Sequence, residues 1–145
     1  MTSLRAELFS VLLAAACSGF AADRTWDGLG TADSNWSTAE NWGGTAPASG
    51  DALFFGGSLR LSNSNDLGEG FSVGGVTFNA GAGAFTLGGA GVALDGDVLN
   101  RDNDTQTLNL PVVLSALRTF HATNGAILVN GPITGAGGLD KKGAY

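Results

Sequence analysis

The sequence predicts an all-β chain that folds as a right-handed parallel β-helix. Glycine accounts for 24 of the 145 residues, yet 43% of the chain is hydrophobic, so we expect a packed fold rather than a flexible linker. Helix signals are nearly absent after residue 23, because glycine or Asn-Asp punctuation interrupts the chain every few residues. The apolar residues fall instead into short groups, which is typical of a chain of short strands.

These apolar groups have the pattern of strands with one buried face. Several alternate apolar and polar residues with a period of two, as in Phe85-Thr86-Leu87. Glycine separates many of them, and glycine tolerates the tight bends between the faces of a β-helix. The groups occupy residues 52–55, 73–78, 85–87, 92–94, 108–114, 120–122 and 127–129.

One phrase recurs at a distance that suits a solenoid. Residues 83–87 (GAFTL) realign with residues 125–129 (GAILV), 42 residues later, and residues 107–110 (TLNL) lie midway. A period of about 20 residues is typical of one solenoid coil, in which equivalent strands of successive coils stack as parallel sheets. The apolar pairs that we align are separated by 23 and then 19 residues, and they are Phe85/Leu87, Leu108/Leu110 and Ile127/Val129.

A β-sandwich is the runner-up architecture. It predicts antiparallel hairpins, and it explains the Asn-Gly and Asp-Gly pairs of the sequence equally well. It does not explain why the phrase at 83–87 returns later in the chain. The repeat therefore favours the β-helix over the sandwich.

The chain divides into three regions. Residues 22–68 hold all three tryptophans and lack the repeated phrase. A solenoid needs a cap that covers the end of its core and blunts its exposed strand edges, and this region is well placed to be that cap. We therefore expect a signal peptide at 1–21, a Trp-containing N-terminal cap region at 22–68, and β-helix coils at 69–145 that are truncated at the C-terminus.

The first residues have the order of a secretory signal peptide. Arg5 lies in a short polar start, residues 8–16 form an apolar run, and small residues lead up to Ala21. The apolar stretch is shorter than the ~20 residues that a membrane-spanning helix needs. Cleavage after Ala21 suits a peptidase that accepts only small side chains. A buried N-terminal helix is the alternative interpretation.

The only cysteine, Cys17, offers an alternative to simple release. Residues 13–17 (LAAAC) resemble a bacterial lipobox, in which the thiol is lipidated and becomes the new N-terminus. Ala14 stands where a large aliphatic residue is usual. With either mode of processing the mature chain has no disulfide, so packing and hydrogen bonding must hold it together.

The charge balance argues against a nucleic-acid partner. Asp and Glu number 13 against 7 Lys and Arg, which gives a net charge of −6. A negative chain repels phosphate backbones and anionic lipid surfaces. We therefore expect no nucleic-acid partner.

The three tryptophans are the candidate ligand-contact residues. Trp26, Trp36 and Trp42 could form an aromatic platform, because flat ring faces stack on the C–H surfaces of sugars. The favoured interpretation is that they pack into the cap, since large aromatic side chains dominate the energetics of small cores. Both interpretations are carried forward.

The remaining polar clusters give no catalytic residue, no metal site and no cofactor. Asp95, Asp97, Asp102 and Asp104 have oxygens that suit Ca²⁺, but their spacing matches neither an EF-hand nor a calcium β-roll, and a solvated turn explains them. His121 has no Asp or Glu nearby in sequence, so a catalytic triad is not supported.

Three segments of the sequence resemble those of a known protein family. Residues 25–28 (TWDG), 35–42 (NWSTAENW) and 131–143 (GPITGAGGLDKKG) are similar to phrases of bacterial proteins with autotransporter-associated β-strand repeats. The resemblance implies a β-helical passenger-type domain of a large secreted or surface protein, including outer-membrane-associated forms. It also implies further repeats downstream, because in this family the last phrase leads into another strand.

We therefore expect an exported, non-catalytic structural or adhesive domain. Its expected partners are the export machinery, downstream repeats of the same protein, and an extracellular glycan or surface partner. One alternative is a carbohydrate-binding module that uses the tryptophans. Another is a fragment of a β-helical polysaccharide lyase or hydrolase, with Arg60, Arg101 and Arg118 neutralising a uronate, although such enzymes need more coils than the three or four present here.

Overall fold

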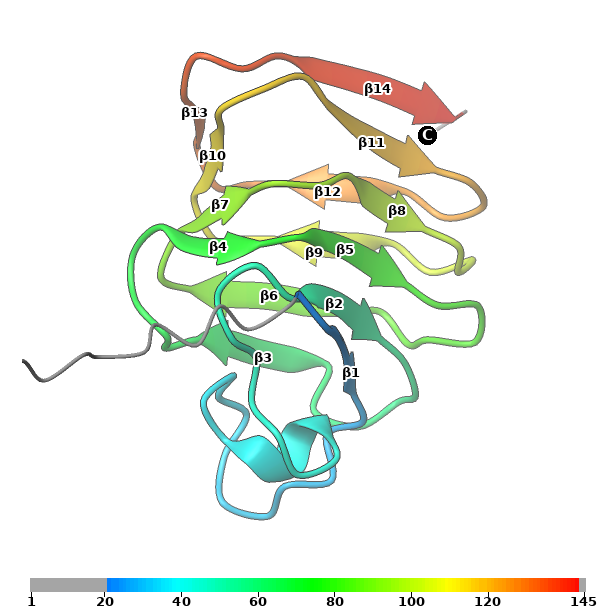
Figure 1. Cartoon of the computed structure of the whole chain (residues 1–145). Helices are drawn as coiled ribbons and strands as arrows, with labels where there is room; N and C mark the ends of the chain where they lie inside the picture. The colour runs from blue at the N-terminus through cyan, green and yellow to red at the C-terminus, as the bar shows by residue number, and fades with distance from the viewer. Residues whose placement is uncertain (1–20, 144–145) are drawn as a thin grey trace, which may run out of the picture.

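The computed structural model describes residues 21–143, which form a parallel β-solenoid of about four turns. Figure 1 shows the turns stacked one above another, with the N-terminal residues at one end and β14 at the other. All the strand pairs of the described region are parallel. The predicted β-helix is therefore confirmed, and the antiparallel β-sandwich is wrong.

Three sheets run along the stack. Sheet A has six strands: β1 (Asp23–Trp26), β2 (Ala52–Phe55), β5 (Gly75–Phe78), β8 (Val98–Asn100), β11 (Arg118–Ala122) and β14 (Leu139–Gly143). Sheet B has four: β3 (Ser62–Asn65), β6 (Thr86–Gly89), β9 (Gln106–Leu108) and β12 (Ile127–Val129). Sheet C has four: β4 (Phe71–Val73), β7 (Val92–Leu94), β10 (Val112–Leu114) and β13 (Ile133–Thr134).

Each turn of the chain visits the three sheets in the same order. The first full turn is β2, β3 and β4, the fourth is β11, β12 and β13, and β14 begins another. Residues 22–68 contain β1, the short 3₁₀ helix η1 (Ala39–Trp42), β2 and β3, so this region also supplies strands to sheets A and B. No helix of the described region is long and apolar enough to cross a membrane.

The core is a column of apolar side chains inside the turns. Phe55 and Phe78 stack with their ring centroids 5.5 Å apart, and Phe85 lies 5.3 Å from Phe55. All three rings are fully buried. Period-two alternation along each short strand places these residues inside and their neighbours outside, which is the pattern that the sequence predicted.

The register of the middle coil differs from the prediction by two residues. Leu87 pairs with Leu108, which pairs with Val129, so both steps are 21 residues rather than 23 and 19. One coil after Phe85, the equivalent inward position is occupied by Gln106, which is polar and fully buried. Its Oε1 accepts a hydrogen bond from the Phe85 N–H at 2.8 Å. The prediction aligned apolar pairs only, so it matched Leu108 and Leu110 to Phe85 and Leu87 in place of Gln106 and Leu108.

Buried asparagines fix two of the bends. Asn100 Nδ2 donates to the carbonyl oxygens of Gly125 and Ala126, at 2.9 and 3.0 Å, one coil further along. Its Oδ1 accepts from the N–H of Asp102 at 2.9 Å. Asn65 forms the same kind of bond to carbonyls 25 and 26 residues ahead. These amides join neighbouring coils where the backbone cannot pair in a sheet.

Glycine at the bends lets successive coils approach closely, and one position tests this. A Cβ at Gly96 would overlap the carbonyl oxygen of Gly74 in the preceding coil. We expect Gly96→Ala to lower the free energy of unfolding by about 1–3 kcal/mol, because the coils must move apart to accept the methyl group. Urea denaturation monitored by circular dichroism measures this change.

Gly56→Ala is the matched control. The nearest atom to its added Cβ would be Asn79 Nδ2 at 3.7 Å, an ordinary contact. This variant should be unchanged or more stable by about 0.4–1 kcal/mol. Equal urea midpoints for the two variants would contradict the close-approach explanation.

Candidate functional site

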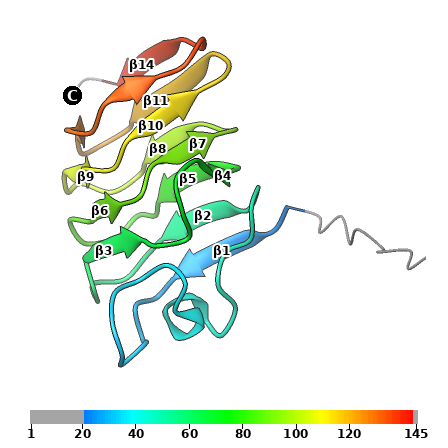
Figure 2. The ribbon, with the colours of Figure 1, turned by 90° about the vertical axis from the view of Figure 1, so that its left-hand side faces the viewer.

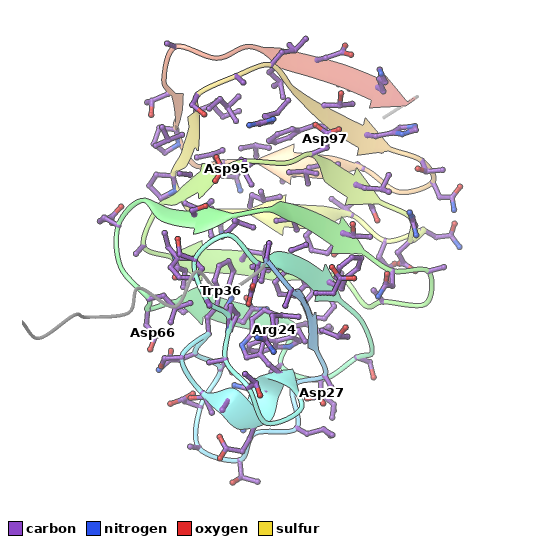
Figure 3. The ribbon with its side chains drawn as sticks, in the orientation of Figure 1. Arg24, Asp27, Trp36, Asp66, Asp95 and Asp97 are labelled. Atoms are coloured by element: carbon purple, nitrogen blue, oxygen red, sulfur yellow. The ribbon has the colours of Figure 1, made fainter. Side chains whose placement is uncertain are left out.

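The three tryptophans form an aromatic cluster at the N-terminal end of the core. Trp26, Trp36 and Trp42 are 0%, 1% and 5% exposed. The Trp42 ring lies edge-on to Trp26 and Trp36, with centroids 5.1 and 6.2 Å apart, and 5.7 Å from Phe55. Figure 3 shows Trp36 inside this end of the stack. The faces of these rings contact one another rather than solvent.

Each indole N–H of the cluster also has a partner. Trp36 Nε1 donates to Asn63 Oδ1 at 2.8 Å, and Trp42 Nε1 donates to the Trp36 carbonyl at 2.9 Å. Trp26 Nε1 reaches the Leu59 carbonyl at 3.4 Å. A sugar could therefore stack on these rings only after this end of the core had opened, so the geometry does not offer the exposed platform that the sequence allowed.

Two loop segments cover the strand edges at the same end. Ser64 in β3 donates its N–H to the Ser34 carbonyl at 3.0 Å and accepts from the Trp36 N–H at 2.9 Å. In sheet C, the N–H of Gly50 bonds to the carbonyl of Ser72 in β4 at 2.9 Å. Figure 2 shows η1 and its flanking loops at this end of the stack. The N-terminal end is thus closed by both side chains and backbone.

A partly buried ion pair anchors one of these loops to β1. Asp51 Oδ2 accepts from Arg24 Nε at 2.8 Å and from the Ala48 N–H at 3.0 Å, while Oδ1 accepts from the Ala22 N–H at 2.8 Å. Burial acts to raise the pKa of the Asp51 carboxyl, but the hydrogen bonds and the Arg24 charge outweigh it. The pKa of Asp51 therefore lies below its usual value, which means that the folded structure favours the charged carboxylate.

A second carboxylate organises the turn that precedes η1. Asp33 Oδ1 accepts from the Thr38 hydroxyl at 2.6 Å and from the Asn35 N–H at 3.0 Å. The Thr38 hydrogen bond is the main reason that the pKa of Asp33 is lowered. Asp33 and Asp51, the two carboxyl groups with lowered pKa values, therefore hold loops in place at the covered end of the molecule.

Among the described residues, the Asp-rich stretch from 95 to 104 included, no three His, Cys, Asp or Glu side chains are grouped so that they could hold a metal ion. Asp95 accepts from the Ser72 hydroxyl, and Asp97 accepts from the Thr119 N–H at 2.8 Å. Asp95 and Asp97 are on the short bend between β7 and β8 (Figure 3). These carboxylates accept hydrogen bonds from neighbouring coils.

The arginines and the histidine of the enzyme hypothesis lie apart. Arg60 follows β2 and donates to Ser34 Oγ at 3.2 Å, whereas Arg118 begins β11 and donates to the Leu94 carbonyl at 3.1 Å. Arg101 follows β8, so it lies at the other end of the sheet A strands from Arg118. His121 alternates with buried Phe120 and Ala122 on β11. The fold does not gather these groups into one groove.

The described cavity lies at the opposite end of the molecule from the tryptophans. It has a volume of about 220 Å³ and an apolar wall, and we call it the open-end cavity. One charged residue, Lys141 of β14, contributes to the wall. No pattern in the sequence predicted this cavity. The lining residues are Phe120, Ala122, Ile127, Val129, Ile133, Leu139 and Lys141.

The signal peptide at 1–21 and the candidate lipidation site Cys17 fall, except for Ala21, outside the described residues. Comparison of the chain with protein-family models, curated proteins and solved structures finds no match. The functional argument therefore rests on the sequence and on the geometry of the solenoid.

The packing role of the tryptophans can be tested by truncation. Trp36→Ala should lower the free energy of unfolding by about 3–5 kcal/mol, because it removes a large, fully buried ring from the aromatic cluster. Thermal unfolding followed by circular dichroism measures the loss. Phe54→Ala is the control, since Phe54 lies between buried Leu53 and Phe55 on β2 and is only partly buried, and it should cost much less. A folded Trp36→Ala protein of unchanged stability would contradict the packing role.

The lowered pKa of Asp51 predicts a pH-dependent contribution to stability. A group whose pKa is lower in the folded chain stabilises the fold above its unfolded pKa, about 3.9, and loses this effect as the pH falls through the folded value. At pH 7, Asp51→Asn should unfold about 1–3 kcal/mol more easily than the wild-type chain. The difference should hold above about pH 5 and narrow below about pH 4.

Urea denaturation at a series of pH values measures this difference. Glu40→Gln, which changes an exposed carboxylate in η1, is the control and should follow the wild-type curve. A constant difference between Asp51→Asn and wild type down to pH 2.5 would show that the Asp51 charge does not stabilise the fold.

Proposed function

We propose that this chain is an exported, non-catalytic structural domain of the passenger type, which serves adhesion or display as part of a larger surface or secreted protein. The observation that carries this proposal is the use of the polar groups. Of the carboxylates considered for Ca²⁺, those of Asp95, Asp97 and Asp102 accept hydrogen bonds from neighbouring coils. The three tryptophans fill the core. These polar and aromatic side chains therefore serve to hold the stack of coils together.

The lining of the open-end cavity supports a non-catalytic role. Six of its seven lining residues are apolar, and the seventh, Lys141, has neither a carboxylate nor a histidine beside it in that lining. General acid–base and nucleophilic catalysis commonly pair the reacting side chain with a second polar group within hydrogen-bond reach. The lining of this cavity contains no such pair, which supports a structural rather than a catalytic role.

The family resemblance supports the same proposal. The parallel solenoid is the fold that autotransporter-associated β-strand repeats imply, and it is reached here from the geometry alone. The phrases at 25–28, 35–42 and 131–143 lie in the covered end and in the last coil. We infer that the chain belongs with passenger-type domains of this family, located outside the bacterial cell or on its surface.

The leader supplies the argument for export. A polar start with Arg5, an apolar run at 8–16 and small residues before Ala22 suit a signal peptidase. Asp23 begins β1, so cleavage after Ala21 would release a chain that starts beside its first strand. Cys17 lies within the removed segment under this scheme and would be the new N-terminus under the lipidation scheme.

Export can be tested with an epitope-tagged chain in a bacterial host. The protein should be recovered outside the cytoplasm with Ala22 as its first residue, as intact-mass spectrometry would show. Ala21→Phe should accumulate with the leader attached, because the peptidase pocket accepts only small side chains at this position.

Cys17→Ser separates the two schemes. Unchanged processing of this variant supports release by cleavage after Ala21, whereas loss of processing together with loss of a fatty-acid label supports lipidation. An unprocessed wild-type chain that stays in the cytoplasm would contradict the proposed function.

A further inference from the structure

The backbone nitrogen of Ala22 lies beside a buried carboxylate, one residue before β1 begins. Its N–H donates to Asp51 Oδ1 at 2.8 Å, and the Ala22 carbonyl accepts from the Ala52 N–H at 2.9 Å. The first residues of a domain are poorly ordered unless bonds of this kind tie them down. Ala22 is therefore held on both sides, and its nitrogen is fixed next to Asp51.

The two oxygens of the Asp51 carboxylate are used differently. Oδ2 accepts from Arg24 Nε at 2.8 Å and from the Ala48 N–H at 3.0 Å. Oδ1 accepts from the Ala22 N–H, its one donor among the described residues, although a carboxylate oxygen has room for two. Asp51 is only 2% exposed. A positive charge on the Ala22 nitrogen would therefore meet a buried negative charge that can still accept.

Cleavage of the leader after Ala21 would change the chemistry of this nitrogen. Hydrolysis breaks the peptide bond between Ala21 and Ala22, leaves the oxygen of water in the new Ala21 carboxylate, and gives Ala22 a free amine. This α-amino group, whose ordinary pKa is about 7.7–8.0, takes a proton at neutral pH. A neutral N–H donor thus becomes an ammonium at the same atom. Hydrogen bonds between charged partners are about twice as strong as those between neutral partners.

We propose that Asp51 is the acceptor for the α-ammonium that leader cleavage creates at Ala22, and that this ion pair makes the processed chain more stable than its precursor. The pair joins the start of β1 to the loop that ends at Asp51, at the covered end of the stack. The inference rests on the proposed function, because it requires cleavage after Ala21. It suits an exported chain, since the fold reaches its full stability only after the leader has been removed.

The ion pair is specific to one N-terminus. Cleavage one residue later would leave Asp23 as the first residue and remove the donor that Asp51 Oδ1 binds. Lipidation at Cys17 would leave Ala22 inside the chain, with a neutral amide nitrogen. Ala21 is exposed, so residues before Ala22 do not disturb the contact. The precursor and the processed chain therefore share the same bond and differ in its charge.

Neighbouring charges and solvent set the size of the effect. Arg24 is the charged side chain that acts on the Asp51 carboxyl, and its guanidinium repels an ammonium at Ala22. Asp23, the exposed next residue, attracts it. Ala22 is partly exposed, so water screens part of the interaction. We therefore expect the charge to lower the equilibrium constant for unfolding by about three- to tenfold.

The first experiment compares two forms of the processed chain by urea denaturation at pH 6.5. Both begin at Ala22 and contain all the strands from β1 to β14. One has a free α-amino group, and in the other this group is acetylated. Acetylation keeps the N–H that Asp51 accepts but removes the charge, so it is the matched control. The equilibrium constant for unfolding of the free-amine chain should be smaller by about three- to tenfold.

Two further chains locate the partner of the charge. A chain that begins at Ala21 has its ammonium one residue earlier and a neutral amide at Ala22, so it should unfold like the acetylated chain. Asp51→Asn, made in the free-amine and in the acetylated chain, should remove the difference between them. This double-mutant cycle isolates the interaction between the α-ammonium and the Asp51 carboxylate.

Three results would overturn the proposal. One is equal stability of the free-amine and acetylated chains. Another is a chain beginning at Ala21 that is as stable as the free-amine chain beginning at Ala22. The third is a difference between free and acetylated chains that persists undiminished in Asp51→Asn. The first comparison uses the unmutated sequence, so it decides the question even if Asp51→Asn does not fold.

This test and the export test fail separately. The chains with defined first residues are released from a fusion partner after purification, so they do not depend on the leader or on a bacterial peptidase. An unprocessed chain in the bacterial host would remove the proposed function while the measured ion pair at Asp51 stands. Equal stability of the free-amine and acetylated chains would remove the ion pair while export stands.

Discussion

Each coil of this solenoid hydrogen-bonds mainly to the coil before it and the coil after it, and the rest of the structure follows from that constraint. Backbone groups that are buried must be paired, so neighbouring coils have to approach to within hydrogen-bond distance at the bends as well as in the sheets. Gly96 has no space for a Cβ above Gly74, and Gly131 has none above Leu110. Stacking therefore requires part of the high glycine content, while other glycines, such as Gly57 and Gly81, have open space around them and adopt a positive φ at turns.

The same constraint explains much of the acidic character of the chain. At the bends, carboxylates accept from the backbone N–H groups of a neighbouring coil, as Glu69 does from Gly91 and Asp102 from Gly81, both at 2.8 Å. Partners of these bonds are about one coil apart in sequence. In the sequence alone, such closely spaced carboxylates resemble a cation-binding cluster. In the fold they replace sheet hydrogen bonds where the backbone turns a corner.

The sequence predicts the architecture well because a solenoid repeats its local pattern. Period-two apolar groups, glycine at the bends and a spacing near 20 residues were enough to predict parallel stacking. The register was harder, because Gln106 occupies a core position and only its hydrogen bonds to the neighbouring coil make this tolerable. The open-end cavity could not be predicted, since it depends on which strand edges remain unpaired. Packing of the tryptophans into the cap was the favoured interpretation, but their contacts with one another depend on the path of the loops around η1.

The inward polar residues show how the two ends of the molecule differ. Asn100 is fully buried and has its amide bonded to the next coil, so its burial costs little. At the covered end, Asn63 Oδ1 accepts from Trp36, while its Nδ2 has no partner among the described residues. Lys141 pairs in register with buried Phe120 but is itself exposed, because no coil covers it in the described chain. An inward polar group in this fold is compatible with packing when a neighbouring coil supplies its partner.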